Sequence, residues 1–291
     1  MIQNQTIILI HGAGSIGNEW ENFKKSFELM GNTVINPTLR YHQSGYICDP
    51  KLGNTSILDY VEDIEKIIKK LNQKPIIIGY SMGGLIALIL CSRGYGKLGI
   101  FLTPAAPSGI NAISLSVIRI FIMNIFRWKF WCKPMPPNFP SAFYGVLHDF
   151  KKEDALRIFK KNYSPESGRA MCEMGFPFFY SNAPTKVDEK NILCPTLTIG
   201  TGRDRITPVQ ISKKLKKKLG EKNELIIFEN FSHYVMEGKE FKEVFSKISD
   251  WILKKIGDSA AWKFLKLNNM ADRMGFEPTR GLPLYSLSRG A

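Results

Sequence analysis

The chain has 291 residues, of which 44% are hydrophobic, and it carries a formal net charge of +14. This length suffices for one sizeable hydrophobic core, or for one core with an inserted lobe. The sequence shows no zinc-ligand spacing, RNP-type motif or DNA-binding helix pattern, so nothing beyond the charge favours nucleic-acid binding. The lysines, which are densest in residues 213–218, are typical of a solvated helix face. They also permit weak contact with an anionic membrane surface.

Five cysteines are scattered along the chain without a C-x-x-C motif, which is typical of reduced thiols in a cytoplasmic protein. No basic region precedes the first apolar run, so we expect no signal peptide. The most apolar stretch, residues 113–131, is interrupted by Arg119, Arg127 and Lys129, which argues against a transmembrane helix. We therefore expect a cytoplasmic protein, and the sequence leaves its oligomeric state open.

An apolar run over residues 6–10 predicts a central parallel strand that is buried on both faces. It ends at His11-Gly12-Ala13-Gly14, where the glycines let the backbone approach a ligand. We expect the N–H of Ala13 to donate a hydrogen bond to an oxyanion, and His11 to brace this loop rather than to transfer protons.

Three further elements follow this loop. Aromatic residues at helical spacing predict a helix over residues 18–30, and residues 33–36 form a short strand pattern that ends at a proline. An amphipathic helix is predicted over residues 56–71, with Ser56 as its cap and Asp59 three residues further on.

The most informative stretch is residues 75–84. An apolar β-branched run leads into Gly79-Tyr80-Ser81-Met82-Gly83, and a buried helix pattern follows. This succession of strand, tight turn and helix is the context of a nucleophile elbow. The turn forces Ser81 into a strained backbone conformation that small neighbours permit, with its Oγ at the carboxyl end of the sheet. The N–H of Met82 then points at an oxyanion beside Ser81.

A strand is predicted over residues 97–103, and after it the composition of the sequence changes. Residues 107–190 are rich in aromatics, contain helical patterns at 113–126 and 152–161, and lack a strand-and-crossover pattern, so they predict an α-helical cap. Aromatic side chains that the cap presents to a cleft would favour an apolar or acyl substrate. Glu166 and Arg169 either bind a polar substrate group or form a local cap or ion pair.

Two chemically important residues follow the last predicted strands. Asp204 comes just after a strand over residues 194–200, and His233 comes just after a strand over 224–228. A helix over residues 239–256 then closes the domain. Residues 270–291 have no periodicity and resemble the spurious translations of structural RNA found in gene predictions. As a hypothesis, the tail over 258–291 is disordered and does not belong to the native protein.

Ser81, Asp204 and His233 supply the three parts of a catalytic triad, each after a different strand. Histidine takes the proton of the weakly nucleophilic serine, and aspartate holds the imidazole in the required tautomer. Of the other histidines, His42 lies in a polar loop and His148 in the cap, and neither follows a core strand. Some hydrolases place the acid after the strand that follows the elbow, but Thr103-Pro104-Ala105 offers none there.

From Thr6 to Ile256 the chain resembles capped members of the α/β-hydrolase superfamily of the esterase, lipase and lysophospholipase-like kind. The resemblance rests on His11-Gly12-Ala13-Gly14, the elbow around Ser81, the Gly202–Pro208 loop and Ser232-His233. It implies an α/β-hydrolase fold, with a doubly wound, mostly parallel sheet and an inserted α-helical cap. The implied core covers residues 1–105 and 191–257, and the cap covers 106–190. The sequence departs from many members by lacking an antiparallel hairpin before Thr6.

These features lead us to expect a serine hydrolase that cleaves an ester or thioester with an apolar acyl or aryl part. The reaction would pass through an acyl-enzyme intermediate and use no metal or organic cofactor. Two alternatives remain open: hydrolysis of a C–C bond or an amide on the same triad, and a ligand-binding protein of this fold that turns over slowly or not at all. The natural substrate, including its acyl length, is not determined by the sequence.

Overall fold

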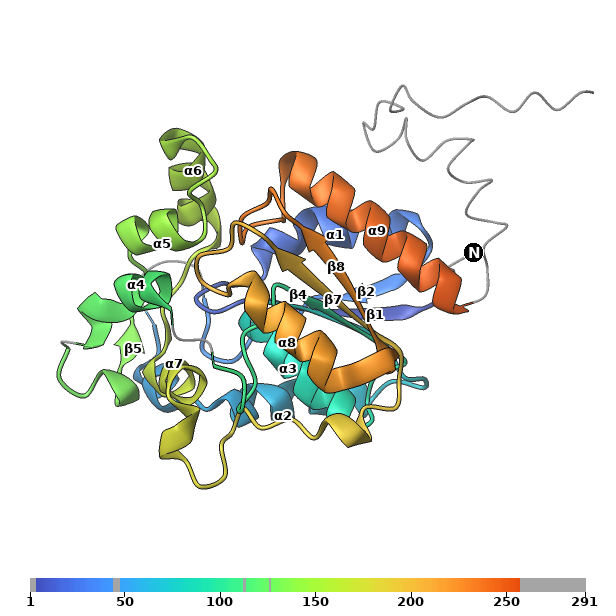
Figure 1. The fold of residues 1–291 in the computed structure, drawn as a ribbon, viewed down its shortest axis with the longest axis horizontal. Coiled ribbons are helices and arrows are strands. Elements are labelled where there is room, and N and C mark those ends of the chain that lie inside the picture. The colour runs from blue at the N-terminus through green and yellow to red at the C-terminus, as the bar shows by residue number, and fades with distance from the viewer. Residues whose placement is uncertain (1–3, 44–47, 112–113, 126, 257–291) are drawn as a thin grey trace, which may run out of the picture.

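The computed structural model describes residues 4–43, 48–111, 114–125 and 127–256. The predicted tail over 258–291 lies outside the described residues. The strands of the main sheet lie side by side in the middle of the molecule, with helices on both faces (Figure 1).

The main sheet has six strands, all parallel, in the order β2-β1-β3-β4-β7-β8. Ile8 pairs with Ile35 on one side and with Ile77 on the other, which makes β1 a central strand. Apolar residues fill the central strands because both faces are covered by helices. The six strands are β1 (Thr6–Ile10), β2 (Thr33–Ile35), β3 (Ile76–Tyr80), β4 (Leu98–Leu102), β7 (Thr196–Thr201) and β8 (Asn223–Phe228).

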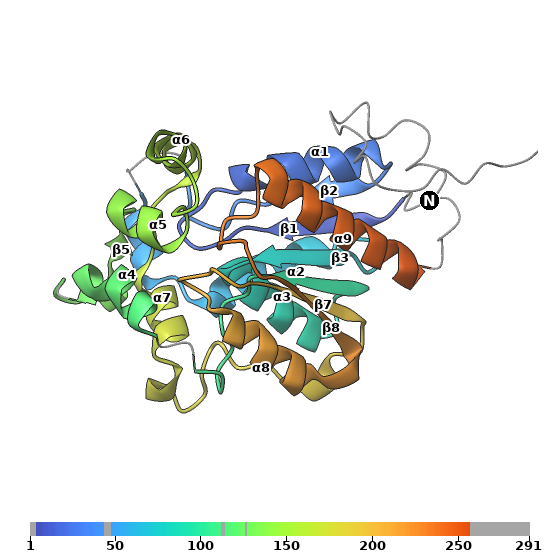
Figure 2. The same cartoon turned by 45° about the horizontal axis from the view of Figure 1, so that its top comes forward.

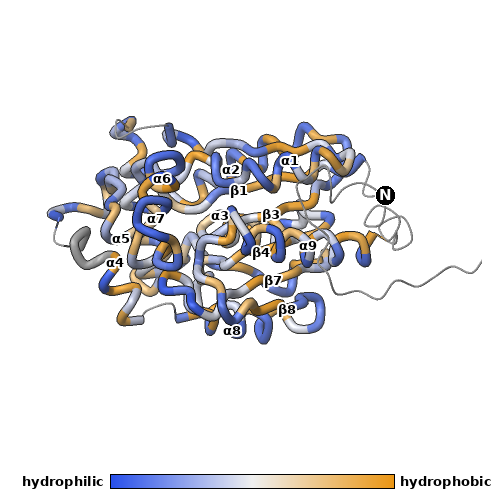
Figure 3. Tube along the Cα trace, turned by 90° about the horizontal axis from the view of Figure 1, so that it is seen from above, coloured by the Kyte–Doolittle hydropathy of each residue, from blue (hydrophilic) through white to orange (hydrophobic). Residues whose placement is uncertain are grey.

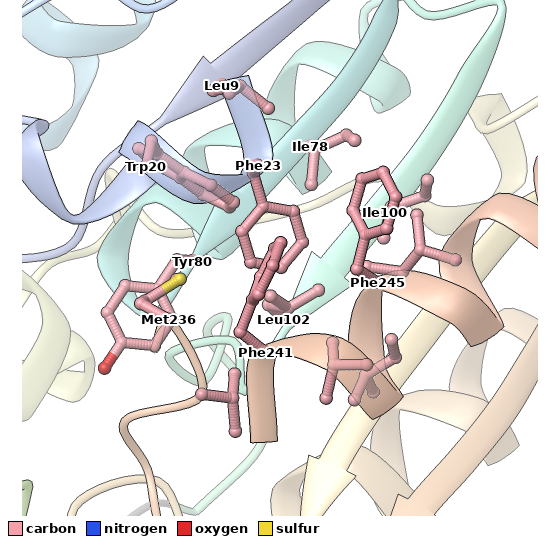
Figure 4. Close-up of a cluster of buried hydrophobic side chains, with 14 of the residues drawn as sticks. Leu9, Trp20, Phe23, Ile78, Tyr80, Ile100, Leu102, Met236, Phe241 and Phe245 are labelled. Carbon is pink, nitrogen blue, oxygen red and sulfur yellow. The ribbon is translucent and has the colours of Figure 1, made fainter. Parts of the chain in front are cut away.

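Helices α1 (Glu21–Leu29) and α9 (Gly238–Ile256) pack on one face of the sheet. Their aromatic side chains interlock over strand residues such as Leu9 and Ile78, which point to the same side because strand side chains alternate (Figure 4). Phe23 contacts Phe241 and Phe245 edge-on, with ring centroids 5.0 and 5.7 Å apart. This cluster packs α1 and α9 against the sheet, including β3, the strand that leads to Ser81.

Helices α2 (Ile57–Ile68), α3 (Met82–Ser92) and α8 (Val209–Leu219) cover the other face. The predicted caps of α2 are present: the Ser56 side chain accepts the Leu58 N–H, and Asp59 accepts the Ser56 N–H. Helix α3 is buried from Met82 to Cys91, as its continuous apolar sequence predicts. Hydrophobic stretches therefore run through the middle of the molecule (Figure 3).

The chain between β4 and β7 leaves the sheet and forms a separate layer beyond the carboxyl ends of the strands (Figure 2). We call residues 106–190 the inserted segment. It contains four helices in its described part, together with one small antiparallel pair of strands, β5 (Pro134–Met135) and β6 (Glu166–Ser167). The helices are α4 (Leu115–Ile125), α5 (Phe139–Gly145), α6 (Lys152–Asn162) and α7 (Gly168–Gly175).

The strands of the main sheet and the long helices agree with the sequence predictions, and the differences concern short elements. The predicted helix over 18–30 is a 3₁₀ turn, η1 (Asn18–Trp20), followed by α1. A further 3₁₀ turn, η2 (Pro50–Asn54), precedes α2. The sequence did not predict α5, α7 or the β5–β6 pair. Within the described residues, no helix combines the length and apolar character needed to cross a bilayer.

Candidate active site

Ser81 occupies a sharp turn between β3 and α3. Its backbone has φ 55° and ψ −117°, a conformation that costs a non-glycine residue about 1–3 kcal/mol. The turn is held by hydrogen bonds from the Ser81 N–H to Leu102 O and from the Ala105 N–H to Ser81 O, both 2.9 Å long. A Cβ added to Gly83 would collide with the backbone carbonyls of Ile10 and His11. A glycine at this position is therefore a steric requirement of the turn.

Two backbone amides lie at the elbow with no backbone acceptor among the described residues. The Met82 N–H is at the first turn of α3, where helix amides have no partner inside the helix. Ala13 belongs to the loop after β1, which passes close to the elbow: a Cβ on Gly12 would lie 3.2 Å from the Ser81 Cβ. Both Ala13 and Ser81 line one cavity. This arrangement suits donation of two hydrogen bonds to an oxygen beside Ser81.

Asp204 and His233 form a buried hydrogen-bonded pair. Asp204 follows β7 and His233 follows β8, and His233 Nδ1 lies 2.7 Å from Asp204 Oδ2. Since an ionised carboxylate only accepts, Nδ1 carries the proton and Nε2 is left as the basic nitrogen. The His233 ring also packs 4.9 Å from the Tyr80 ring. Ser81 and His233 line the same cavity, although no hydrogen bond joins their side chains in the described structure.

Asp204 is held in place by its own loop. Its Oδ1 accepts the backbone N–H groups of Ile206 and Thr207, at 2.9 and 2.7 Å. Thr207 Oγ1 lies 2.8 Å from Asp204 Oδ2 and 3.1 Å from His233 Nδ1. Thr207 Oγ1 also lies 3.0 Å from the carbonyl oxygen of Thr103, a β-branched residue with φ 39°. Such strain in a β-branched residue is characteristic of functional sites.

The cavity above Ser81 has a volume of about 150 Å³ and lies between the core and the inserted segment. Loop residues 12–15 form one side together with the elbow and His233. Most of the opposite side is apolar and comes from the inserted segment. Its apolar residues include Ile120, Met135, Pro136, Pro137, Ala142, Val146 and Met171.

A buried polar cluster fixes the loop that carries Ala13. The Leu39 N–H donates to His11 Nε2 at 3.0 Å, so His11 Nδ1 carries the proton and donates to Gly12 O at 2.8 Å. Burial and the neighbouring His42 lower the pKa of His11 to about 3. His11 is therefore neutral and braces the loop, as we expected from its position.

Glu166 reaches this loop from the inserted segment. Its Oε2 accepts the Gly14 N–H at 2.8 Å and lies 3.1 Å from His42 Nε2, while its Oε1 accepts the Tyr60 hydroxyl at 2.8 Å. Burial alone would raise the pKa of Glu166, but the charge and hydrogen bond of His42 and the backbone donors lower it to about 2. Burial opposes the charged form of His42, yet Glu166 outweighs it and raises the pKa of His42. The two groups form a buried ion pair.

The structure separates Glu166 from Arg169. The Glu166 carboxylate contributes to the cavity wall, but protein donors engage both of its oxygens. Arg169 points away, donates to Glu173 Oε1 at 2.9 Å and to Asn54 O at 3.2 Å, and lines a different groove. Substrate binding by these two residues stays a prediction, and neither is placed to act in concert with the other.

Sequence reasoning missed three residues of the site: Thr207, His42 and Tyr60. Thr207 has a local signal, because Asp-x-x-Thr spacing lets both the backbone N–H and the hydroxyl reach the Asp204 carboxylate. His42 and Tyr60 have none, since their partner Glu166 is more than a hundred positions away in the sequence. Among the residues that the structure describes, no group of three or more His, Cys, Asp or Glu side chains could hold a metal ion.

A parallel sheet with helices on both faces, a serine at a strained turn after its third strand, and an Asp–His pair on the loops after β7 and β8 define a protein of the α/β-hydrolase fold. The sequence model of the alpha/beta hydrolase family matches residues 7–245. The chain belongs to this family, which confirms the resemblance and the predicted fold class.

Solved structures with the same fold include several esterases and lipases. A monoacylglycerol lipase from Paleococcus ferrophilus is 18% identical, with a TM-score of 0.63 over 87% of this chain and 96% of the lipase. A lipase-esterase related protein from Clostridium acetobutylicum is 18% identical, with a TM-score of 0.61 over 86% of this chain and 95% of that one. A methylesterase from Arabidopsis is 14% identical, with a TM-score of 0.61 over 85% and 98%. At these identities the likeness shows the fold alone, and no curated protein matches the sequence significantly.

Proposed function

We propose that the protein is a serine hydrolase that cleaves an ester or thioester with a small apolar acyl or aryl part. The observation that carries this proposal is the shared cavity. It brings Ser81, at its strained turn, together with His233, whose Nδ1 is hydrogen-bonded to Asp204 Oδ2 at 2.7 Å. The backbone amides of Ala13 and Met82, which have no backbone acceptor among the described residues, support the same proposal. Each part has a separate task in acyl transfer.

In the first half of the reaction, Ser81 Oγ attacks the substrate carbonyl carbon, and its proton passes to His233 Nε2. The negative charge that forms on the carbonyl oxygen accepts hydrogen bonds from the Ala13 and Met82 N–H groups, each worth roughly 100- to 1000-fold in rate. The imidazolium, stabilised by Asp204, then gives its proton to the leaving alcohol or thiol. In the second half, water attacks the acyl carbon and gives a proton to His233 Nε2. His233 then returns a proton to Ser81 Oγ as the acid leaves.

The cavity favours a small acyl or aryl group. Its volume of about 150 Å³ and its apolar wall are comparable to a cavity that holds one benzene ring. A short acyl chain or one aromatic ring fits such a space, and a long chain does not. The inserted segment supplies most of this wall, so we propose that it acts as the cap of the site and sets acyl length.

The polar end of the cavity favours a leaving group with a hydroxyl. Asn162 is 2% exposed and lines the cavity. Its Nδ2 donates to the Tyr234 hydroxyl at 3.0 Å, but its Oδ1 has no hydrogen-bond partner among the described residues. An unpaired buried polar atom costs about 1–3 kcal/mol, which a substrate hydroxyl would recover once the Asn162 side chain turns its Oδ1 into the cavity. This favours an ester of a polyhydroxy alcohol over one of a simple alcohol.

A substrate panel tests the proposal. We expect wild type to hydrolyse butanoate esters and the matching thioester, to cleave octanoate and longer esters at least about 10-fold more slowly, and to prefer glycerol monobutanoate to ethyl butanoate. Asn162→Leu should remove this last preference without loss of ethyl butanoate hydrolysis. Faster cleavage of an amide or a β-diketone than of every ester would contradict the proposal in favour of the amide or C–C alternative. Tight binding of these compounds without turnover would indicate a ligand-binding protein.

A further inference from the structure

The inserted segment exposes a group of large aromatic side chains far from the core. They lie in or directly before two short 3₁₀ turns, η3 (Phe130–Cys132) and η4 (Pro177–Phe179). Trp128 and Phe179 are each 76% exposed, and Phe178 is 66% exposed. Leaving such large apolar surfaces in water is costly, and a concentration of them marks an interaction site. We call Trp128, Trp131, Phe178 and Phe179 the aromatic face.

The two turns face one another across a groove of about 520 Å³. Trp131 contributes from one turn, and Phe179 from the other. The aromatic rings pack within each turn, with centroids of Phe178 and Phe179 4.5 Å apart and those of Trp128 and Trp131 6.3 Å apart. The groove is lined by Asn54, Phe130, Trp131, Cys132, Arg169, Cys172, Phe176, Phe179 and Tyr180.

The two stretches of sequence that carry the aromatic face contain basic residues but no acidic ones. The sequence contains no Asp or Glu from Pro107 to His148, nor from Met174 to Val187. Lys129 and Lys133 are exposed beside Trp128 and Trp131, and neither forms an ion pair within the part of the chain that the structure describes. Glu173, which directly precedes the second of these stretches, is buried, accepts a hydrogen bond from Ser56 and pairs with Arg169.

We propose that the aromatic face docks on the surface of an anionic lipid bilayer, with the rings at the boundary between headgroups and acyl chains and the lysines among the headgroups. Tryptophan and phenylalanine enter this boundary because they combine large apolar area with a stiff side chain. Each lysine near an anionic membrane surface strengthens the binding of the protein to that surface about fivefold. Exposed rings, an acid-free surrounding sequence and unpaired lysines occur together here, which is the composition of an interfacial anchor.

Docking would also place the cavity at the bilayer. The chain around the aromatic face continues directly into Met135, Pro136 and Pro137, which line the cavity above Ser81. Figure 2 shows α4, β5 and α7 together at one end of the molecule, with the C-terminal end of α9 at the other. A short-chain or aryl ester that partitions into the membrane surface would thus lie near the cavity. This delivery role rests on the proposed hydrolase function, whereas docking itself does not.

Vesicle flotation at 0.15 M salt tests the proposal with the full-length protein. The probes are vesicles of phosphatidylcholine alone and of phosphatidylcholine with 30% phosphatidylserine. We expect wild type to float with the anionic vesicles and at least about 10-fold less with the neutral ones. The double variant Lys129→Glu/Lys133→Glu should lose at least about 10-fold in binding, and Trp128→Ser/Phe179→Ser should lose binding at any salt concentration.

A matched control separates this surface from overall charge. Lys213→Glu/Lys217→Glu makes the same change in net charge on the exposed side of α8 and should bind like wild type. Equal loss in this control, or no binding of wild type to anionic vesicles, would overturn the proposal. So would an effect of Trp128→Ser/Phe179→Ser on self-association, measured by sedimentation, that leaves flotation unchanged, because the face would then be an interface between copies of this chain.

Hydrolysis of a water-soluble short ester, measured on each preparation, distinguishes the two claims. We expect all three double variants to match wild type in this assay, since none of the changed residues lines the cavity above Ser81. Vesicle binding by a preparation without esterase activity would leave the docking surface standing and remove the delivery role. Esterase activity without vesicle binding would overturn the docking surface, and the delivery role with it, but would leave the proposed hydrolase function standing.

Discussion

Replacing Glu166 by glutamine should destabilise the protein in a pH-dependent way. The carboxylate accepts the Gly14 N–H, the Tyr60 hydroxyl and the His42 ring, and it joins the inserted segment to the loop that carries Ala13. Glutamine keeps the shape but removes the charge, and its amide nitrogen cannot accept a hydrogen bond. One of the buried donors on that side therefore loses its partner.

The size of the effect follows from the pKa of Glu166. Its lowering from 4.5 to about 2 corresponds to about 3 kcal/mol of folding free energy at pH values above 4.5. For a domain of this size, 1 kcal/mol shifts the melting temperature by about 2–4 °C. We therefore expect Glu166→Gln to melt about 6–12 °C below wild type near pH 6.

The sign of the pH dependence differs for the two partners. The depressed pKa of Glu166 gives stability that is present above pH 4.5 and is lost as the pH falls through about 2. The raised pKa of His42 gives stability that is fully present below pH 6.5 and is lost as the pH rises through its folded value. The difference in melting temperature between wild type and Glu166→Gln should thus be largest between about pH 4.5 and 6.5, and should decline at higher pH.

Thermal unfolding followed by circular dichroism from pH 5 to 9.5 checks this expectation. Glu173→Gln is the matched control, because Glu173 is equally buried and accepts from Ser56, Ile57 and Arg169 but has no histidine partner. Its deficit should stay flat across this range. A deficit for Glu166→Gln below about 2 °C, or one that does not change with pH, would refute the reasoning.

Three further predictions concern the catalytic loop and the elbow. Asp204→Asn should lower kcat about 10³- to 10⁴-fold with folding intact, because His233 loses the partner that fixes its tautomer; circular dichroism and steady-state kinetics check both parts. Thr207→Val should lower kcat about 10- to 100-fold, as expected for one hydrogen bond to a charged group, and Thr207→Ser should restore most of it. Retained activity in Thr207→Val would leave the hydroxyl without a positioning role. Gly83→Ala should fail to fold or melt at least about 10 °C lower, because its Cβ meets backbone carbonyls, whereas Gly175→Ala, where space is open, should melt like wild type.

Local sequence signals sufficed to predict much of the fold. The elbow could be located because its glycines are steric requirements of one turn, and these stand next to Ser81 in the chain. The capped helix after Ser56 follows equally local rules, since its capping box spans four residues. The short helices α5 and α7 were missed although each begins at a side-chain cap, Asn138 and Ser167 respectively. Seven or eight residues show too few turns for a periodic pattern to stand out.

The contacts that hold the loops of the site in place were much less predictable from the sequence. From the sequence, Glu166 was expected either to bind a polar substrate group or to form a local cap or ion pair, yet it is buried beside His42 and accepts the Gly14 N–H. No rule of spacing connects these residues, because the contact exists only after the inserted segment has folded back over the sheet. The separation of Glu166 and Arg169 has the same origin: β6 ends between them, and α7 turns Arg169 toward Glu173.

The central claim is that Ser81 is a nucleophile activated by His233 and Asp204. The most direct test treats wild type, Ser81→Ala and His233→Ala with a fluorophosphonate probe and measures the intact mass of each protein. We predict one adduct on wild type, none on Ser81→Ala, and an adduct on His233→Ala that forms far more slowly. A folded wild-type protein that forms no adduct, or one whose adduct persists in Ser81→Ala, would contradict the account and leave ligand binding as the function that this fold supports.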